Sequence, residues 1–253
     1  MTGAVDELHW ASAGALATAI RRREVSSREV LEHLVARIGE RDVVNAVVRF
    51  DLDRARAAAR AADDAVARGG DEALGPLHGV PMTIKDSFPT EGCVTTSGAP
   101  ELADHVPEAD CWPVARLRAA GAIPFAKTNL PIFAGDIQSF NDVYGTTDNP
   151  YDASRTCGGS SGGSAAALAM GFTPIELGSD IGGSIRIPAA FCGLLGMKGT
   201  AGRIPRGPRT EIAPLMVVKG CQARSVRDAA RWYDVCAGHD SRDPYSLPSH
   251  GRW

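Results

Sequence analysis

The sequence predicts an α/β fold built around a β-sheet core. From about residue 75, short apolar runs typical of strands alternate with segments of helical pattern. The runs "GVPMTIKD" and "GAIPFAKT" are strand-like, and "DCWPVARLRAAG" between them has a helical pattern. The chain has 253 residues, 44% of them hydrophobic, which is enough to bury one sizeable core.

The first seventy residues are predicted to be mostly helical. "SSREVLEHLVARIGERD" predicts a helix that begins after a cap at Ser26 or Ser27. Its apolar face is formed by Val30, Leu31, Leu34 and Ile38. "NAVVRF" predicts a short strand, and "DLDRARAAARAADDAVARGG" predicts an Ala-rich helix that ends at the glycine pair.

The rest of the chain completes a single predicted domain over residues 1–253. Residues 1–70 form a helical leader, and residues 71–236 form the sheet core that carries the motifs. "ARSVRDAARWYDVCAG" predicts a late amphipathic helix. Residues 237–253 are polar and contain proline, which is typical of a linker. No internal repeat is visible.

Composition excludes several classes of protein. Lysine and arginine number 27 against 30 aspartates and glutamates, and no basic stripe is present, so we expect no nucleic-acid partner. We expect neither a signal peptide nor a membrane span, because no suitable apolar stretch occurs. The six cysteines form no CxxC pair and favour buried thiols. These features indicate a cytoplasmic globular protein.

The stretch "SDIGGSIRIPAAFCG" predicts a site for a developing negative charge. Glycines let successive N–H groups converge, and the proline indicates a short helix whose N-terminus adds a positive dipole. The backbone N–H groups of Ile181, Gly182, Gly183 and Ser184 could form an oxyanion hole beside the Ser184 hydroxyl. The alternative is a plain glycine-rich turn with a serine helix cap.

"CGGSSGGS" offers a second serine. It contains GxSxG, the pattern of an α/β-hydrolase nucleophile elbow with Ser160 as the nucleophile. An elbow should follow an apolar strand, yet "NPYDASRT" precedes it, and only His239 and His250 lie downstream as possible bases. A Walker A loop does not fit, because no GK[ST] ends the run.

Lys85 is a candidate base for either serine. It lies in the strand-like run "GVPMTIKD", where burial can lower a lysine pKa from about 10.4 towards 7. The alternative is an ion pair between Lys85 and Asp86 at a strand end. The histidines are scattered without metal-ligand or dyad spacing, so we expect neither a metal nor another cofactor.

Together these stretches resemble the amidase signature family. "GGSSGGSAAALAMGFTPIELGSDIGGSIRIPAAFCGLLGMKGT" is similar to the family's signature over its full length. "GPLHGVPMTIKD", "VARLRAAGAIPFAKTNLP" and "NDVYGTTDNPYDASRT" resemble the segments before it. The resemblance implies the amidase signature fold, which has a mixed central sheet flanked by helices.

The resemblance also implies a catalytic triad. Ser184 is the nucleophile, Ser160 is the bridging serine reached through a cis peptide bond, and Lys85 is the base. Ser161, Asp180 and Arg186 are expected to support the site. The implied reaction is hydrolysis of a small-molecule amide through a Ser184 acyl-enzyme, without a cofactor.

The resemblance covers the N-terminal half of the family's domain, so we expect a sheet that is incomplete on its C-terminal side. Exposed apolar surface there would favour self-association or a partner that covers it. Two alternatives to an independent amidase follow: a catalytically silent fragment with a scaffold role, and an amidotransferase-type subunit that works with a partner.

Overall fold

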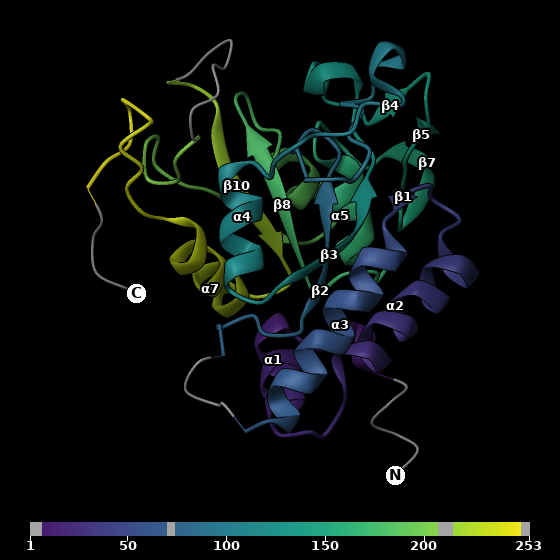
Figure 1. Ribbon diagram of the computed structural model, residues 1–253. Coiled ribbons are helices and arrows are strands. Elements are labelled where there is room, and N and C mark those ends of the chain that lie inside the picture. Colours follow the sequence, from purple (N-terminus) through teal and green to yellow (C-terminus); the bar gives the residue numbers. More distant parts are fainter. Residues whose placement is uncertain (1–6, 70–73, 207–214, 249–253) are drawn as a thin grey trace.

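The computed structural model describes residues 7–69, 74–206 and 215–248 (Figure 1). The helices are α1 (Ala13–Arg21), α2 (Ser27–Arg41), α3 (Leu52–Ala67), α4 (Trp112–Ala119), α5 (Gly162–Ala169), α6 (Arg186–Phe191) and α7 (Val226–Cys236), with short 3-10 turns η1 (Leu8–Trp10), η3 (Pro100–Leu102) and η4 (Ile132–Ala134). The strands are β1 (Val47–Phe50), β2 (Pro81–Lys85), β3 (Ile123–Thr128), β4 (Phe140–Asn141), β5 (Gly145–Thr146), β6 (Asp148–Asn149), β7 (Asp152–Thr156), β8 (Ile175–Asp180), β9 (Leu195–Lys198) and β10 (Val218–Ala223).

Six strands form one mixed sheet in the order β1-β3-β2-β8-β10-β9. β2 runs parallel to β3 and β8, whereas β1 is antiparallel to β3, and β10 is antiparallel to both β8 and β9. Every residue of β2 and β3 is buried, as expected for strands with neighbours on both sides. The predicted α/β fold with a mixed central sheet is therefore confirmed.

The parallel strands bring the motifs to one edge of the sheet. Because β2 and β8 run the same way, their carboxyl ends lie at the same edge (Figure 1). Lys85 ends β2 and Asp180 ends β8. Ligand sites in open α/β sheets lie outside the carboxyl ends of the strands, so this edge is where a site is expected.

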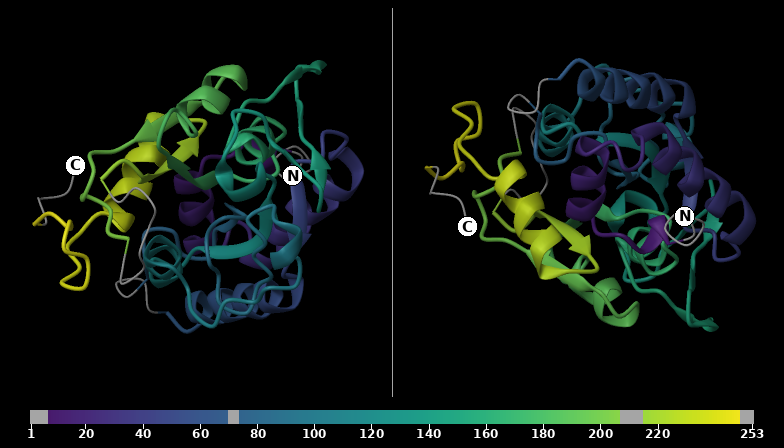
Figure 2. Two further views of the ribbon diagram at one scale, coloured as in Figure 1. Left: turned by 90° about the horizontal axis from the view of Figure 1, so that it is seen from above. Right: turned by 90° about the horizontal axis from the view of Figure 1, so that it is seen from below.

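Helices cover the sheet and share its core. α3 and α4 pack on β3, α7 packs on β10, and α5 contacts β2, β3, β8 and β10. One buried apolar cluster takes side chains from α1 to α5 and from α7. The helical leader is thus part of the same core, and its strand β1 belongs to the sheet. Figure 2 shows α2 and α7 at opposite ends of the molecule.

The start of α2 shows how the sequence specifies a helix boundary. Ser26 Oγ accepts a hydrogen bond from the Glu29 N–H at 3.1 Å, and Glu29 Oε2 accepts one from the Ser26 N–H at 2.8 Å. This is a capping box, and it makes Ser26 the cap. Ser27 is instead buried, and its hydroxyl donates to Gly79 O at 2.6 Å. The predicted apolar face of α2 is the buried one.

The polar tail differs from a linker. Its described part, residues 237–248, contains no helix or strand, but it folds back onto the chain. Asp243 forms a buried ion pair with Arg206, with 2.9 Å between Oδ1 and Nη2. The Leu247 N–H donates to Gly202 O at 2.8 Å. Residues 249–253 of the predicted tail lie outside the described residues. All six cysteines are free and buried, as the composition indicated.

Candidate active site

Lys85 is fully buried at the end of β2. Its Nζ lies 2.7 Å from Ser160 Oγ and 3.0 Å from Ser161 Oγ, which are hydrogen-bond distances. Ser179 Oγ lies 3.3 Å from the same nitrogen. Lys85 therefore contacts three hydroxyl groups at the carboxyl edge of the sheet.

Burial changes the protonation of this lysine. It lowers the pKa of Lys85 from 10.5 to about 7, because the charged ammonium has lost its water. The carboxylates of Glu176 and Asp180 act in the opposite direction, and the positive charge of Lys219 lowers the pKa further. A substantial share of Lys85 is therefore the neutral amine near pH 7.

The alternative of an ion pair between Lys85 and Asp86 is not what the structure has. Asp86 Oδ2 instead accepts a hydrogen bond from the Thr96 N–H at 3.1 Å. Burial raises the pKa of Asp86, and the charge that most opposes this increase is that of Lys127 rather than Lys85. Asp86 lies just beyond the end of β2, and its partners differ from those of Lys85.

The first serine motif lies just before α5. The Gly159–Ser160 peptide bond is cis, and Ser160 and Ser161 precede Gly162, the first residue of that helix. Backbone from residues 136–138 packs tightly on Gly159, where a Cβ would lie 2.7 Å from the carbonyl carbon of Ile137. Only glycine allows this approach, which is a physical reason for the glycines around Ser160.

The second serine motif is a turn organised by Asp180. Its carboxylate accepts hydrogen bonds from the N–H groups of Gly183 at 2.9 Å and Ile185 at 3.0 Å. Arg186 adds an ion pair, with 2.9 Å between Nη2 and Oδ1. Burial acts to raise the pKa of Asp180, but the hydrogen bonds from Arg186 and the backbone outweigh it and hold the pKa below its ordinary value. Gly183 has a φ of +125°, a conformation that favours glycine.

The backbone donors of this turn are not equivalent. The Gly183 N–H, one of the four predicted oxyanion donors, donates to Asp180. Within the described parts of the chain, no acceptor bonds to the N–H groups of Ile181, Gly182 or Ser184. Three of the four predicted donors are therefore available, and the fourth holds the turn in place. Sequence reasoning could not separate them, because all four lie in one glycine-rich run.

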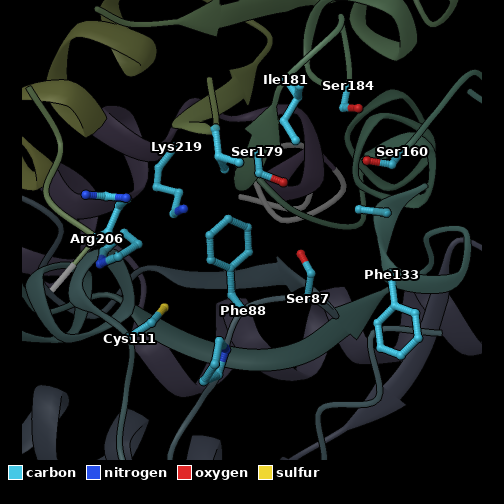
Figure 3. A pocket seen from close by; sticks show the side chains of 14 residues that line it. Ser87, Phe88, Cys111, Phe133, Ser160, Ser179, Ile181, Ser184, Arg206 and Lys219 are labelled. Carbon is cyan, nitrogen blue, oxygen red and sulfur yellow. The ribbon is translucent and has the colours of Figure 1, made fainter. Parts of the chain in front are cut away.

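A pocket of about 370 Å³ opens at this edge (Figure 3). Ser160 and Ser184 both line it, and Figure 3 shows them at the same wall. The Ser184 hydroxyl has no hydrogen-bond partner among the described residues. Lys85 does not line the pocket itself, but its Nζ contacts Ser160, which does. The other lining residues are Ser87, Phe88, Pro89, Cys111, Pro113, Phe133, Ala134, Ser179, Ile181, Arg206, Val217 and Lys219.

Sequence reasoning missed three residues of this region. Ser179 contacts Lys85, Lys219 lines the pocket, and Glu176 is a fully buried acid whose pKa burial raises to about 7. Thr128 Oγ1 donates to Glu176 at 2.8 Å. Glu176 could have been noticed in the sequence, because it is an acid inside the apolar run "TPIELG". An acid in such a run is expected to be buried and to have a hydrogen-bond partner.

The α/β-hydrolase alternative lacks its structural context. The strand before Ser160 is β7, whose residues are mostly exposed, whereas an elbow follows a buried strand. Ser160 Oγ contacts the Lys85 amine, and no histidine is among the described residues that line the pocket. His250 lies outside the described residues. In the described parts of the chain, no cluster of His, Cys, Asp or Glu could hold a metal, and no helix is long and apolar enough to span a membrane.

Comparison with known proteins gives consistent matches. The family model described as Amidase matches residues 29–252. A glutamyl-tRNA(Gln) amidotransferase subunit of Anaeromyxobacter sp. (strain K) is 46% identical over 225 residues, covering 88% of this chain and 45% of the relative. The protein of the same name from Psychrobacter sp. (strain PRwf-1) is 41% identical over 244 residues, covering 96% and 48%. The chain spans about half the length of the curated relatives it matches.

Solved structures agree with the sequence matches. A bacterial aryl acylamidase of the amidase signature family is 33% identical with a TM-score of 0.89, covering 97% of this chain and 51% of its own. A 6-aminohexanoate cyclic dimer hydrolase is 35% identical with a TM-score of 0.87, covering 96% and 50%. A family model that matches most of the sequence, together with relatives above 40% identity, places this chain in the amidase signature family.

Proposed function

We propose that this chain carries the catalytic site for hydrolysis of a carboxamide to a carboxylic acid and ammonia or an amine, with Ser184 as the nucleophile. One observation carries the proposal: the desolvated amine of Lys85 lies 2.7 Å from Ser160 Oγ, in the wall of a pocket that Ser184 also lines. A neutral amine can accept a proton from a hydroxyl, which an ammonium cannot do.

In the acylation step, Lys85 takes the proton of Ser160 while Ser160 takes the proton of Ser184. Ser184 Oγ then forms a bond to the amide carbon, and the carbonyl oxygen becomes an oxyanion. The N–H groups of Ile181, Gly182 and Ser184 donate to it. The proton returns along the same path to the leaving nitrogen, the C–N bond breaks, and an acyl-enzyme remains.

Deacylation uses the same groups in the same order. A water molecule replaces the departed amine and loses its proton to the relay as it attacks the ester carbon. The ester bond to Ser184 breaks, the acid leaves, and Ser184 recovers its proton. No cofactor enters either step, because the lysine supplies the base and the backbone supplies the positive field.

Ser161, Asp180 and Arg186 have supporting roles in this proposal. The Ser161 N–H donates to Ser184 O at 3.1 Å, which ties the first serine motif to the second. Ser161 Oγ also contacts Lys85. Asp180 and Arg186 fix the turn that carries Ser184. These residues position the reacting groups and exchange no proton with the substrate.

Labelling with a serine-reactive fluorophosphonate tests the mechanism, with peptide mass spectrometry to locate the adduct. We expect an adduct on Ser184 in the wild type and almost none in Lys85→Ala, because the base is lost. Lys198→Ala is the matched control, since Lys198 is exposed on β9 and outside the pocket. An adduct on Ser160 would instead support the α/β-hydrolase alternative. A folded chain without any adduct would support a silent fragment.

A second candidate function is that of one component of an amidotransferase. Two relatives above 40% identity are named as subunits of glutamyl-tRNA(Gln) amidotransferase, and a subunit by name has partners. The same site would then release the nitrogen of an amide for transfer rather than to solvent. Affinity purification from the native host distinguishes the two: a second polypeptide in fixed ratio supports the amidotransferase, and an active chain without one supports the independent amidase.

Two further predictions from the sequence remain proposals. The shared apolar cluster supports a single domain that includes the helical leader. The six free, buried thiols support a reducing compartment such as the cytoplasm.

A further inference from the structure

We infer that Lys127 is a positioning residue for the pocket: it restrains the wall that Phe88 forms, and through that wall it sets which groups the pocket prefers. This inference rests on the proposed function, because it concerns the selectivity of the same site. Lys127 lies on β3, is 1% exposed and does not line the pocket itself. The proposed proton relay does not use it. A lysine this deeply buried needs specific partners, and those partners lead to the wall.

The Lys127 ammonium donates to the segment that follows β2. Its Nζ lies 2.7 Å from Phe88 O and 2.9 Å from Thr90 Oγ1. The Thr90 hydroxyl also donates to Phe88 O, at 3.1 Å. Phe88 and Thr90 are both buried, so these hydrogen bonds are shielded from water, which strengthens them. Two side-chain donors therefore meet at a single carbonyl group, that of Phe88.

The same residue forms part of the pocket wall. Three consecutive residues of the segment line the pocket, namely Ser87, Phe88 and Pro89. Figure 3 shows the Phe88 ring pointing into the pocket. The Phe88 N–H donates to Lys85 O at 3.1 Å, and Lys127 adds a restraint on the carbonyl side of Phe88. A shift of this one carbonyl would therefore displace a continuous stretch of the wall.

Charge makes Lys127 suited to this role. Burial lowers its pKa, and the carboxylate of Asp86 is the charge that most opposes this decrease. Asp86 is itself fully buried, and its Oδ2 accepts a hydrogen bond from the Thr96 N–H. A hydrogen bond from a charged donor is about twice as strong as one between neutral groups. The ammonium therefore fixes the Phe88 carbonyl more firmly than the Thr90 hydroxyl alone would.

A role in stability alone predicts a different outcome from a role in selectivity. If the buried charges of Lys127 and Asp86 only stabilised the fold, their loss would slow the reactions of all substrates of the site alike. If Lys127 acts through Phe88, its loss changes the ratio between a ligand that reaches the wall and one that does not. The pocket of about 370 Å³ has room for a ligand that reaches the wall.

The test measures labelling of Ser184 in the full chain by two fluorophosphonates that differ only in the group on phosphorus, methyl or 2-phenylethyl. We expect the wild type to react faster with the phenylethyl probe, because the Phe88 wall binds its ring. Lys127→Met should lose at least about tenfold of that preference, mainly through the probe concentration that gives the half-maximal rate. Lys198→Met, which removes an exposed lysine outside the pocket, should keep the preference.

The Phe88→Ala variant shows whether Lys127 acts through the wall. Phe88→Ala should lose a similar part of the preference, and adding Lys127→Met to it should change the ratio no further. Separate, additive losses, an equal effect of Lys127→Met on both probes, or a wild-type preference for the methyl probe would overturn the inference. If Lys127→Met does not fold, Asp86→Asn combined with Lys127→Met makes the same comparison without an unpaired buried charge.

The pH dependence of labelling separates the wall from the base. The charges that act on the pKa of Lys85 are those of Glu176, Asp180 and Lys219. Lys127→Met should therefore leave the rising limb of the pH profile in place while it changes the ratio of the two probes. A shift of that limb, together with equal effects on both probes, would connect Lys127 with the base instead and overturn the inference.

Hydrogen exchange, followed by mass spectrometry, tests the restraint on Phe88 without any reaction. In Lys127→Met we expect faster exchange in the peptide that contains Phe88, with exchange in α7 unchanged as the internal control. Unchanged exchange at Phe88 in the folded variant would overturn the inference even if Ser184 is labelled. Faster exchange, in a protein whose Ser184 neither probe labels, would support the restraint on Phe88 and contradict the proposed function.

Discussion

Lys85 combines a cost in stability with a proposed role as the base. Its folded-state pKa of about 7 lies below the unfolded value of about 10.4, so the unfolded chain binds more protons between these values. The contribution of this residue to the free energy of unfolding therefore rises with pH across that window and is least favourable below pH 7. The same desolvation leaves a neutral amine beside Ser160, which is the form that a base requires.

The pH dependence of the reaction follows from the pKa of this one residue. In the proposed mechanism the neutral amine of Lys85 is the base, so kcat/KM should rise with pH through about 7. Glu176→Gln removes the carboxylate that favours the ammonium, so we expect the rising limb to move to lower pH. Lys219→Met removes a positive charge and should move the limb higher.

The measurement is the pH profile of kcat/KM for a neutral amide, so that substrate ionisation does not contribute. Lys198→Met is the control and should keep the wild-type profile, because its charge is exposed to water. A profile that is flat between pH 5 and 9, or a downward shift in Lys219→Met, would contradict the assignment of Lys85 as the base.

Among the structural elements, the turn between β8 and α6 carries Ser184, the proposed nucleophile. One carboxylate, Asp180, satisfies two backbone N–H groups and Arg186 at once. The side chain of Arg186 is 54% exposed, whereas that of Asp180 is fully buried. The carboxylate is therefore the part that fixes the turn, and the exposed guanidinium contributes less because water screens it.

We expect Asp180→Ala to slow fluorophosphonate labelling of Ser184 by about 10²–10³, because the released Gly183 and Ile185 N–H groups let the proposed oxyanion donors move. Arg186→Met should slow it much less. Asp152→Ala is a matched control, since Asp152 also pairs with an arginine, Arg155 at 2.9 Å, on an exposed hairpin. Equal labelling rates in Asp180→Ala and the wild type, with folding checked by circular dichroism, would refute this role.

In the molecule as a whole, the central sheet ends in a strand with one partner. β9 pairs only with β10 among the described strands. Beside it runs a groove whose apolar lining comes from β9 and α7: Leu195, Met197, Val226, Ala229, Ala230 and Tyr233. An unpaired strand edge next to apolar surface is a template for another chain. This matches a sheet that is incomplete on its C-terminal side.

We expect residues 1–253, made alone, to self-associate through this groove as their concentration rises. The double variant Met197→Glu with Val226→Glu should be more monomeric, because it puts charge on the surface that would be buried. Val43→Glu is the control, since Val43 is an exposed valine far from β9 in the sequence and outside the groove. Sedimentation velocity measures the outcome, and a monomer at every concentration would rule out this surface as a self-association site.

Features that depend on residues close together in the sequence could be predicted from the amino-acid sequence alone. The spacing of Val30, Leu31, Leu34 and Ile38 predicted the buried face of α2, and the apolar runs predicted β2 and β3. Propensity, capping and periodicity act over a few residues, so they can be read directly from the chain. The two serine motifs and Lys85 could be named as a set only through resemblance to a family.

The meeting of distant residues became visible only in the folded chain. Folding brought Lys85 to Ser160 and added Ser179 as a third hydroxyl. It assigned the Gly183 N–H to Asp180, brought the polar tail back onto Arg206, and put Lys219 in the pocket. These outcomes depend on strand order, on register and on how completely packing removes water from a side chain. Those quantities are set by contacts between residues far apart in the chain. They cannot be predicted from a local sequence pattern.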